Sequence, residues 1–254
     1  KNEIKLNNLN FIFFESLNKN ILFKDKIILN HDENLDKIKL EYDQNNKKKI
    51  LIIGDSVSED LAIAIKGTNK FNDYQVRHLT YGLKKLIINT KKNIKIFDSS
   101  LYKQADIVIF NFKAFTINLS ANQLNNRISY SNKIKKYVEQ DKKIVFFSSN
   151  NPNFNTLLNP LVYLIKVKKI NDEKQISREL YKLIPEKFHN YNSKLIKYYE
   201  KNNINHINLF SIFCDNISKK CKFMDANQNI LFFDFVHLTK SGKDFLGNRL
   251  DIVF

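Results

Sequence analysis

Apolar runs that alternate with segments of helical character constrain the fold of this chain more than any other feature. The runs ILIIG at 50–54, DIVIF at 106–110 and KIVFF at 143–147 lack the polar–apolar alternation of a half-exposed strand. Such runs are typical of parallel strands that helices cover on both sides. We therefore predict an α/β fold, with a doubly wound, mostly parallel sheet flanked by helices in a three-layer sandwich.

The remaining elements continue this alternation along the chain. We predict helices over 58–67, closed by Gly67, and over 121–142, 174–184, 191–202 and 241–254. Further strands are expected over 74–81 and 93–100, and a strand followed by a short helix over 204–214.

The chain is expected to hold one main domain with an extension. Its 254 residues suffice to bury one sizeable core. Residues 1–48 are apolar in patches and then highly charged, so we interpret them as an N-terminal extension and linker that packs on a main domain of residues 49–254. No run approaches the ~18 apolar residues of a membrane-spanning helix. Because the chain starts with Lys1, we expect it to be part of a longer protein.

The net charge of +16 does not indicate a nucleic-acid-binding protein. Of the 42 basic residues only four are arginines, and the lysines are spread along the whole chain rather than clustered. Arginine is the better partner for phosphates and base edges. We therefore expect no nucleic-acid partner, while attraction to anionic glycans or lipid headgroups stays open.

The two cysteines, Cys214 and Cys221, are seven residues apart. Two cysteines at this spacing are too few for a four-ligand zinc site. They are either a disulfide that closes a small loop, which implies an oxidising compartment, or two free thiols of a cytosolic protein. We favour the disulfide.

A turn that is a candidate site for catalysis follows the first apolar run. Gly54, one of five glycines, allows a sharp turn, and Asp55 or Ser56 can cap the helix that starts there. Ligands of doubly wound sheets bind beyond the carboxyl ends of the strands, where Ser56 is expected to lie. The plain alternative is a capped strand-to-helix turn without chemistry, with Asp55 as a structural turn residue.

The other half of a candidate site stands near the end of the chain. Asp234 and His237 are three residues apart in the stretch DFVHLTKSG. A nucleophilic serine needs a base to take its proton, and that base needs a carboxylate to fix its tautomer. The alternative is that Asp234 caps the last helix and His237 is a half-buried structural side chain. Among the other histidines, His78 and His206 are interpreted as structural, and His31 and His189 as exposed.

The two motifs together resemble those of the SGNH (GDSL-like) hydrolases, here Gly54-Asp55-Ser56-Val57 and Asp234-Phe235-Val236-His237. The carboxyl-terminal third most resembles the SGNH domains fused to acyltransferase-3 membrane proteins, which O-acetylate bacterial surface polysaccharides. That likeness rests on two cysteines, then a strand NQNILFF at 227–233, then DFVHLTKSG. It spans roughly residues 49–250 and implies the SGNH, flavodoxin-like sandwich.

The resemblance implies roles for individual residues. Ser56 would be the nucleophile, His237 the general base and then acid, and Asp234 the residue that orients the imidazole. The family supplies a glycine and an asparagine to its oxyanion hole, for which Gly82 and Asn111 are the nearest candidates. No Gly-x-Asn-Asp block follows residues 105–112, which departs from the family pattern. The resemblance implies neither a metal nor a cofactor.

The resemblance implies O-acyl transfer, most simply of an acetyl group, to a bacterial cell-surface polysaccharide through an acyl-enzyme. The acyl donor would be delivered by a membrane acyltransferase domain or partner, which places the domain in the periplasm or elsewhere in the cell envelope. A carbohydrate acetylesterase of the same fold is the alternative within enzymes. A glycan-binding or scaffolding module without catalytic activity is the alternative of another class.

Overall fold

The computed structural model of the chain describes residues 42–80, 95–112, 121–156 and 159–251. A parallel five-stranded sheet with the order β2-β1-β3-β4-β5 lies at its centre. This order and the all-parallel pairing confirm the predicted doubly wound α/β fold. The strands are β1 (Lys48–Gly54), β2 (Tyr74–Thr80), β3 (Ile107–Asn111), β4 (Ile144–Ser148) and β5 (His206–Ile207).

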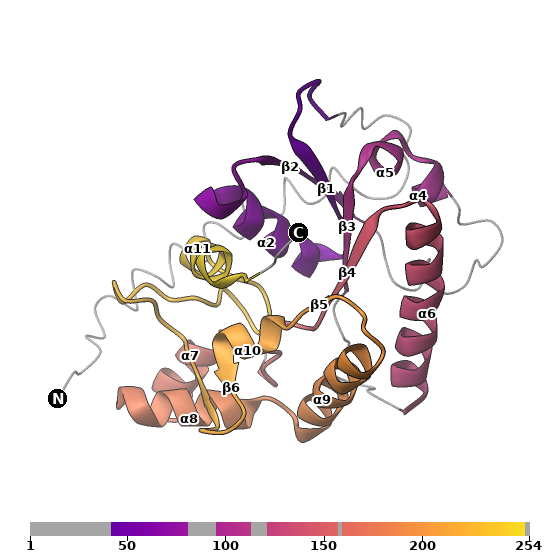
Figure 1. Ribbon diagram of the computed structural model, residues 1–254. Coiled ribbons are helices and arrows are strands. Elements are labelled where there is room, and N and C mark those ends of the chain that lie inside the picture. Colours follow the sequence, from indigo (N-terminus) through magenta and orange to yellow (C-terminus); the bar gives the residue numbers. More distant parts are fainter. Residues whose placement is uncertain (1–41, 81–94, 113–120, 157–158, 252–254) are drawn as a thin grey trace.

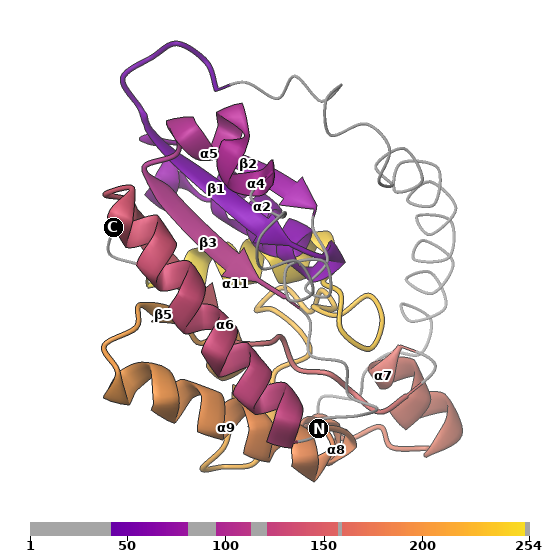
Figure 2. The same ribbon diagram turned by 90° about the vertical axis from the view of Figure 1, so that its right-hand side faces the viewer.

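Helices cover both faces of the sheet (Figure 1). On one face α2 packs against β1 and β2 and is itself covered by α11. The opposite face carries α4, α5, α6 and α9, and Figure 2 shows α6 crossing in front of the strands with α11 behind them. Their bounds are α2 (Ser56–Gly67), α4 (Lys95–Asp98), α5 (Ser100–Gln104), α6 (Ala121–Gln140), α9 (Glu186–Lys201) and α11 (Lys240–Arg249).

Shorter elements fill the region beyond the carboxyl ends of β4 and β5. The 3-10 turn η2 (Asn69–Phe71) lies elsewhere, between the end of α2 and the start of β2. The others are α7 (Pro160–Val162), the π-helical turn η4 (Tyr163–Val167), α8 (Glu173–Leu183), α10 (Leu209–Phe213), β6 (Cys214–Asp215) and β7 (Lys220–Cys221). The last two form an antiparallel hairpin, and the Cys214–Cys221 disulfide joins its strands. The predicted disulfide is thereby confirmed.

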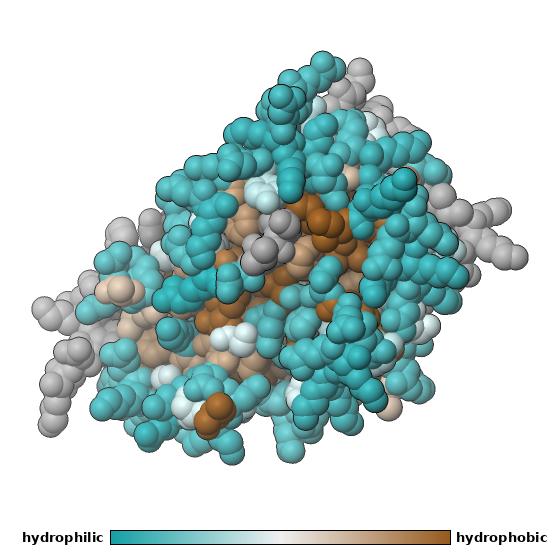
Figure 3. All heavy atoms as spheres, in the orientation of Figure 1, coloured by the Kyte–Doolittle hydropathy of each residue, from teal (hydrophilic) through white to brown (hydrophobic). Residues whose placement is uncertain are grey.

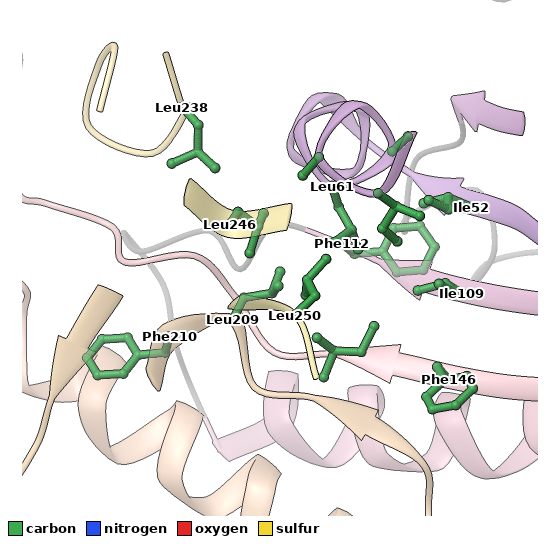
Figure 4. Packing of buried hydrophobic residues seen from close by; sticks show 14 of the residues in the cluster. Ile52, Leu61, Ile109, Phe112, Phe146, Leu209, Phe210, Leu238, Leu246 and Leu250 are labelled. Carbon is green, nitrogen blue, oxygen red and sulfur yellow. The ribbon is translucent and has the colours of Figure 1, made fainter. Parts of the chain in front are cut away.

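The apolar runs form the core, as their composition predicts. Residues 50–53 of β1 are fully buried, and every residue of β3 is buried. Figure 4 shows Leu61 of α2 and Leu246 of α11 in the same layer as Ile52 and Ile109 of the sheet. Hydrophilic residues cover most of the face seen in Figure 3, and hydrophobic residues show along its middle. Burial of this continuous apolar layer supplies the main driving force for folding.

The strand predicted over 93–100 is wrong. In the described part of that stretch the chain forms α4 and then enters α5. The Ser99 hydroxyl accepts a hydrogen bond from the Tyr102 backbone N–H, which caps α5. Phe97 packs edge-on against Tyr102, at 4.9 Å between ring centroids. A serine cap and an aromatic contact thus outweigh the β propensity of the isoleucines in this short segment.

Other element predictions need smaller corrections. The strand expected at 227–233 is reduced to two isolated bridges, Met224–Ile230 and Phe232–Leu238. The last helix begins at Lys240, because the Thr239 hydroxyl accepts a hydrogen bond from the Gly242 N–H and caps it. The end of the predicted extension contacts the main domain, since Tyr42 is buried in the core. The domain boundary at 48/49 itself stays a prediction.

The turn between β1 and α2 is held by hydrogen bonds from three sides. The Asp55 carboxylate caps α2 by accepting the Val57 N–H at 3.1 Å. The Ser58 hydroxyl, fully buried, donates to the Asp55 carbonyl at 2.5 Å and lies 2.6 Å from His78 Nε2 of β2. Burial lowers the pKa of His78 to about 4. The ring is therefore neutral near pH 7, and Nε2–H donates to Ser58.

The contact between α2 and α11 depends on a glycine. A Cβ atom built on Gly247 would lie 2.4 Å from the Ala64 carbonyl oxygen, a backbone atom that no rotamer change can remove. At Gly67 the nearest atom to such a Cβ, Asp244 Oδ1, is 3.9 Å away, which is ordinary contact.

We expect Gly247→Ala to lower the free energy of unfolding by about 1–3 kcal/mol or more, because the two helices must separate. Gly67→Ala is the matched control and should leave stability unchanged or raise it by up to about 1 kcal/mol, since alanine is the better helix former. Urea denaturation of both variants measures this. Equal stabilities would show that the close approach of the helices is not required.

Folding stability should also depend on pH through His78. Its pKa falls from 6.5 to about 4 on folding, so the unfolded chain binds more protons between these values. Stability is therefore lost as the pH falls from 6.5 towards 4, by about 3 kcal/mol in total. Denaturation curves between pH 7 and 4.5 should show this loss reduced in His78→Gln. Parallel pH dependences for wild type and variant would contradict the assignment.

Candidate active site

The structure brings together the three residues that the motifs single out. Ser56 is the first residue of α2, at the carboxyl end of β1, and its Oγ lies 2.9 Å from His237 Nε2. On the other side of the ring, His237 Nδ1 lies 2.7 Å from Asp234 Oδ2. The hydroxyl and the imidazole come from positions 181 residues apart. Hydroxyl, imidazole and carboxylate thus form one hydrogen-bonded chain.

The loop that carries Asp234 and His237 is organised by the Asp234 carboxylate. Its Oδ1 accepts the backbone N–H groups of Val236 and His237 at 2.8 and 2.7 Å, while Oδ2 faces the imidazole. Burial alone would raise the pKa of Asp234, but the hydrogen bonds from His237 and Val236 and the attraction of the imidazole hold it below the ordinary value. The ionised carboxylate therefore keeps the ring proton on Nδ1, and Nε2 is left to accept the hydrogen bond of the Ser56 hydroxyl.

This arrangement is open to solvent at Ser56. Ser56 is exposed, and the side chains of His237 and Asp234 are 29% and 31% exposed. The alternative in which Asp234 caps the last helix is wrong, because Thr239 caps α11. A substrate can therefore reach the Ser56 hydroxyl without a large rearrangement of the described residues.

Of the two residues expected to complete an oxyanion hole, the structure describes Asn111. Asn111 is the last residue of β3, fully buried, and its Nδ2 donates to the Val57 carbonyl at 3.4 Å. Its Oδ1 is buried without a hydrogen-bond partner in the described structure. Gly82 lies outside the described residues. The assignment of both to an oxyanion hole stays a prediction.

Among the described residues, the other histidines are not part of this chain of hydrogen bonds. His206 begins β5, and its Nδ1 lies 3.2 Å from the Ile204 carbonyl. His189, expected to be exposed, is half-buried, because it stacks on Tyr181 and meets Phe210 edge-on. His31 lies outside the described residues.

Sequence reasoning missed the polar run that follows β4. The side chains of Asn150, Asn151 and Asn153 are buried, and Asn151 Nδ2 donates to the Val236 carbonyl at 3.4 Å. The Phe154 N–H donates to the Phe235 carbonyl at 2.9 Å. This run therefore supports the loop that carries His237. A cluster of asparagines at the carboxyl end of a predicted buried strand was the signal that could have found it.

Arg127 of α6 was missed as well. It is buried and donates to the carbonyls of Phe112 and Ser148 at 2.9 and 3.1 Å, which joins the carboxyl ends of β3 and β4. An arginine on the apolar stripe of a helix, spaced with Ser131, Ile134 and Val138, was the available signal.

Within the described ranges, no group of three or more His, Cys, Asp and Glu side chains could hold a metal ion. The helices described there are also all too short or too polar to cross a bilayer.

Solved structures share the fold of this chain at low sequence identity. The periplasmic domain of a Salmonella ser. Paratyphi A lipopolysaccharide acetyltransferase is 21% identical, with a TM-score of 0.61 over 81% of this chain and 83% of that one. An acetyl xylan esterase, AlAXEase, is 15% identical, with a TM-score of 0.50 over 79% and 96%. An acylhydrolase from Bacteroides fragilis, described as putative, is 16% identical, with a TM-score of 0.50 over 85% and 92%.

A search with the sequence finds no significant match among curated proteins. The model of one protein family, described as "SGNH domain (fused to AT3 domains)", matches residues 29–251. Most of the chain is covered, and both motifs fall inside the match. The chain therefore belongs to the family of SGNH domains that are fused to AT3 domains.

Proposed function

We propose that this domain is a serine O-acyltransferase that forms an acyl-enzyme on Ser56 and passes the acyl group to a hydroxyl of a cell-surface polysaccharide. The observation that carries the proposal is the hydrogen-bonded chain from Ser56 through His237 to Asp234. Serine, imidazole and carboxylate in this order make up the machinery of acyl transfer on several unrelated folds.

In the first half-reaction, His237 Nε2 takes the Ser56 proton as Oγ attacks the carbonyl carbon of the acyl donor. The tetrahedral intermediate collapses when the imidazolium donates this proton to the leaving group of the donor, and the acyl group remains on Oγ. Asp234 stabilises the imidazolium between these two transfers. In the second half-reaction, His237 deprotonates the acceptor hydroxyl, which attacks the acyl-enzyme. The proton then returns to Ser56.

The negative charge on the tetrahedral oxygen needs hydrogen-bond donors. The Ser56 backbone N–H, at the first position of α2, is one proposed donor, because the start of a helix favours negative charge. The Gly82 N–H is proposed as the second. Asn111 is proposed as a third only if its amide can leave the Val57 carbonyl, to which it is bound at 3.4 Å.

Transfer is preferred to hydrolysis because of the kind of protein in which this domain type occurs. Domains of this family are fused to AT3 domains, which supports an acyl donor delivered by a membrane-embedded partner. The periplasmic domain of a lipopolysaccharide acetyltransferase shares the fold. The Cys214–Cys221 disulfide fits an oxidising, extracytoplasmic compartment. An acetylesterase is the second candidate, supported by the fold shared with an acetyl xylan esterase.

Removal of the nucleophile tests the assignment directly. We expect Ser56→Ala to reduce turnover of a chromogenic acetyl ester on the order of a thousandfold or more, because the covalent intermediate cannot form. Ser193→Ala, on an exposed position of α9, is the matched control and should keep wild-type turnover. Wild-type activity in Ser56→Ala would overturn the nucleophile assignment. A wild-type domain without any ester turnover would favour a binding module.

The choice between transfer and hydrolysis depends on the acceptor. With the same acetyl ester as donor, we expect added oligosaccharides to give acetylated sugar, detected by mass spectrometry, and to raise the rate of donor consumption. This product should be missing with Ser56→Ala. Release of free acetate alone, whatever oligosaccharide is offered, would favour the esterase.

A further inference from the structure

A buried ion pair lies directly behind the candidate triad. Asp60 of α2 and Lys243 of α11 are 4% and 7% exposed, and Lys243 Nζ lies 3.1 Å from Asp60 Oδ1. The other carboxylate oxygen, Oδ2, accepts the backbone N–H of Leu238 at 2.9 Å. Leu238 is the residue after His237. One carboxylate thus contacts α11 and the loop of the proposed base from the helix that starts with the proposed nucleophile.

A buried ion pair of this kind contributes little net stability to a fold. Two charges lose their hydration in the interior, and well-packed apolar residues of similar volume are often as stabilising or more so. Burial accordingly raises the pKa of Asp60, while Lys243, the Leu238 N–H and the charge of His237 all oppose that rise. Because the lysine and the amide both favour the ionised form, the carboxylate can stay charged in this buried position. Bulk stability therefore does not explain why the pair is there.

The geometry of α2 gives the pair a role in the site. Ser56 and Asp60 are four residues apart on one helix, so their side chains lie on the same face, one turn apart. The helix holds the Ser56 hydroxyl, and the Asp60 carboxylate holds the backbone next to His237. Helix α2 joins Ser56 to Asp60, and the Asp60 hydrogen bond joins that helix to Leu238, the neighbour of His237. These few contacts help to fix the distance between Ser56 Oγ and His237 Nε2.

We propose that Asp60 is a positioning residue for His237. It ties the loop of the base to the nucleophile helix through the Leu238 N–H, and Lys243 holds the carboxylate in the orientation that this requires. The inference rests on the proposed function, because it assigns the Ser56–His237 distance a catalytic purpose. Asp60 itself touches neither Ser56 Oγ nor substrate in this account.

Two double variants separate positioning from packing. Asp60→Asn with Lys243→Gln removes both charges but keeps an oxygen that can accept the Leu238 N–H. Asp60→Leu with Lys243→Met removes the same charges and keeps the volume, but it offers no acceptor. Both leave the net charge of the protein unchanged, and neither buries an unpaired ion. Any difference between them therefore reports on the hydrogen bond to Leu238.

We call the Asp60→Asn/Lys243→Gln variant the polar pair and the Asp60→Leu/Lys243→Met variant the apolar pair. We expect the polar pair to keep kcat for the acetyl ester within about threefold of wild type. The apolar pair should lower kcat on the order of 10- to 100-fold with KM little changed, because the imidazole is no longer held in register with the hydroxyl. Its melting temperature should be no lower than that of the polar pair. Equal kcat values for the two folded variants would show that the ion pair serves packing alone.

Nuclear magnetic resonance of histidine-labelled protein measures whether the His237 ring is held in one orientation, independently of catalysis. The His237 ring, assigned with His237→Gln, should give one set of sharp signals in wild type and in the polar pair. Broadened or doubled signals are expected in the apolar pair, and sharp unshifted signals there would overturn the proposal. If no variant turns over ester, the proposed function fails, while these signals still decide the role of Asp60.

A measurement on the unmodified protein covers the case in which the apolar pair does not fold. The Leu238 amide should exchange with solvent as slowly as the interior amides of α2, because its hydrogen bond to Asp60 opens only when the helix and the loop separate. Exchange of Leu238 as fast as that of exposed loop amides would contradict a tie between Asp60 and this loop.

Discussion

The parallel pairing of β1 with β3, in a sheet that continues to β2 on the other side, is the constraint on which the site depends. Connections leave β1 and β3 towards opposite faces at this point, so a crevice forms beyond the carboxyl ends of the two strands. Gly54 pairs with Asn111 there, and a Cβ on Gly54 would lie 1.7 Å from the Asn111 carbonyl oxygen. Only a glycine permits this approach, and the turn that follows raises Ser56 above the sheet edge.

The carboxyl-terminal segment supplies what the sheet edge lacks. Helix α11 packs on α2 through Gly247, and the loop before it brings His237 and Asp234 to Ser56. The loop is also held by the polar run after β4, through the Val236 and Phe235 carbonyls. The site is therefore assembled from three connections that lie far apart along the chain: the turn between β1 and α2, the segment after β4 and the loop before α11. Its geometry depends on how tightly helix and loop are fixed to the sheet, which is the role we assign to Asp60.

Sequence reasoning succeeded where a short pattern decides the outcome. Uninterrupted apolar runs specify buried parallel strands, and the two motifs specified the family. It failed at 93–100, where two isoleucines favour a strand but a Ser99 cap and the packing of Phe97 on Tyr102 favour helices. It also missed the buried polar residues Asp60 and Arg127. The spacing of Arg127 with the apolar stripe of α6 indicates burial, but a helical pattern does not show which groups in the core will pair with a polar side chain.

The sequence by itself therefore determined the fold class, the family and which residues supply the hydroxyl, the imidazole and the carboxylate, namely Ser56, His237 and Asp234. Each of these follows from a local pattern of a few residues. Only the tertiary structure decided that Ser56 Oγ and His237 Nε2 lie 2.9 Å apart and that Asp60 connects their two elements. Those facts depend on contacts between segments about 180 positions apart. Such contacts follow from the packing of α2, α11 and the sheet as a whole, which no local pattern encodes.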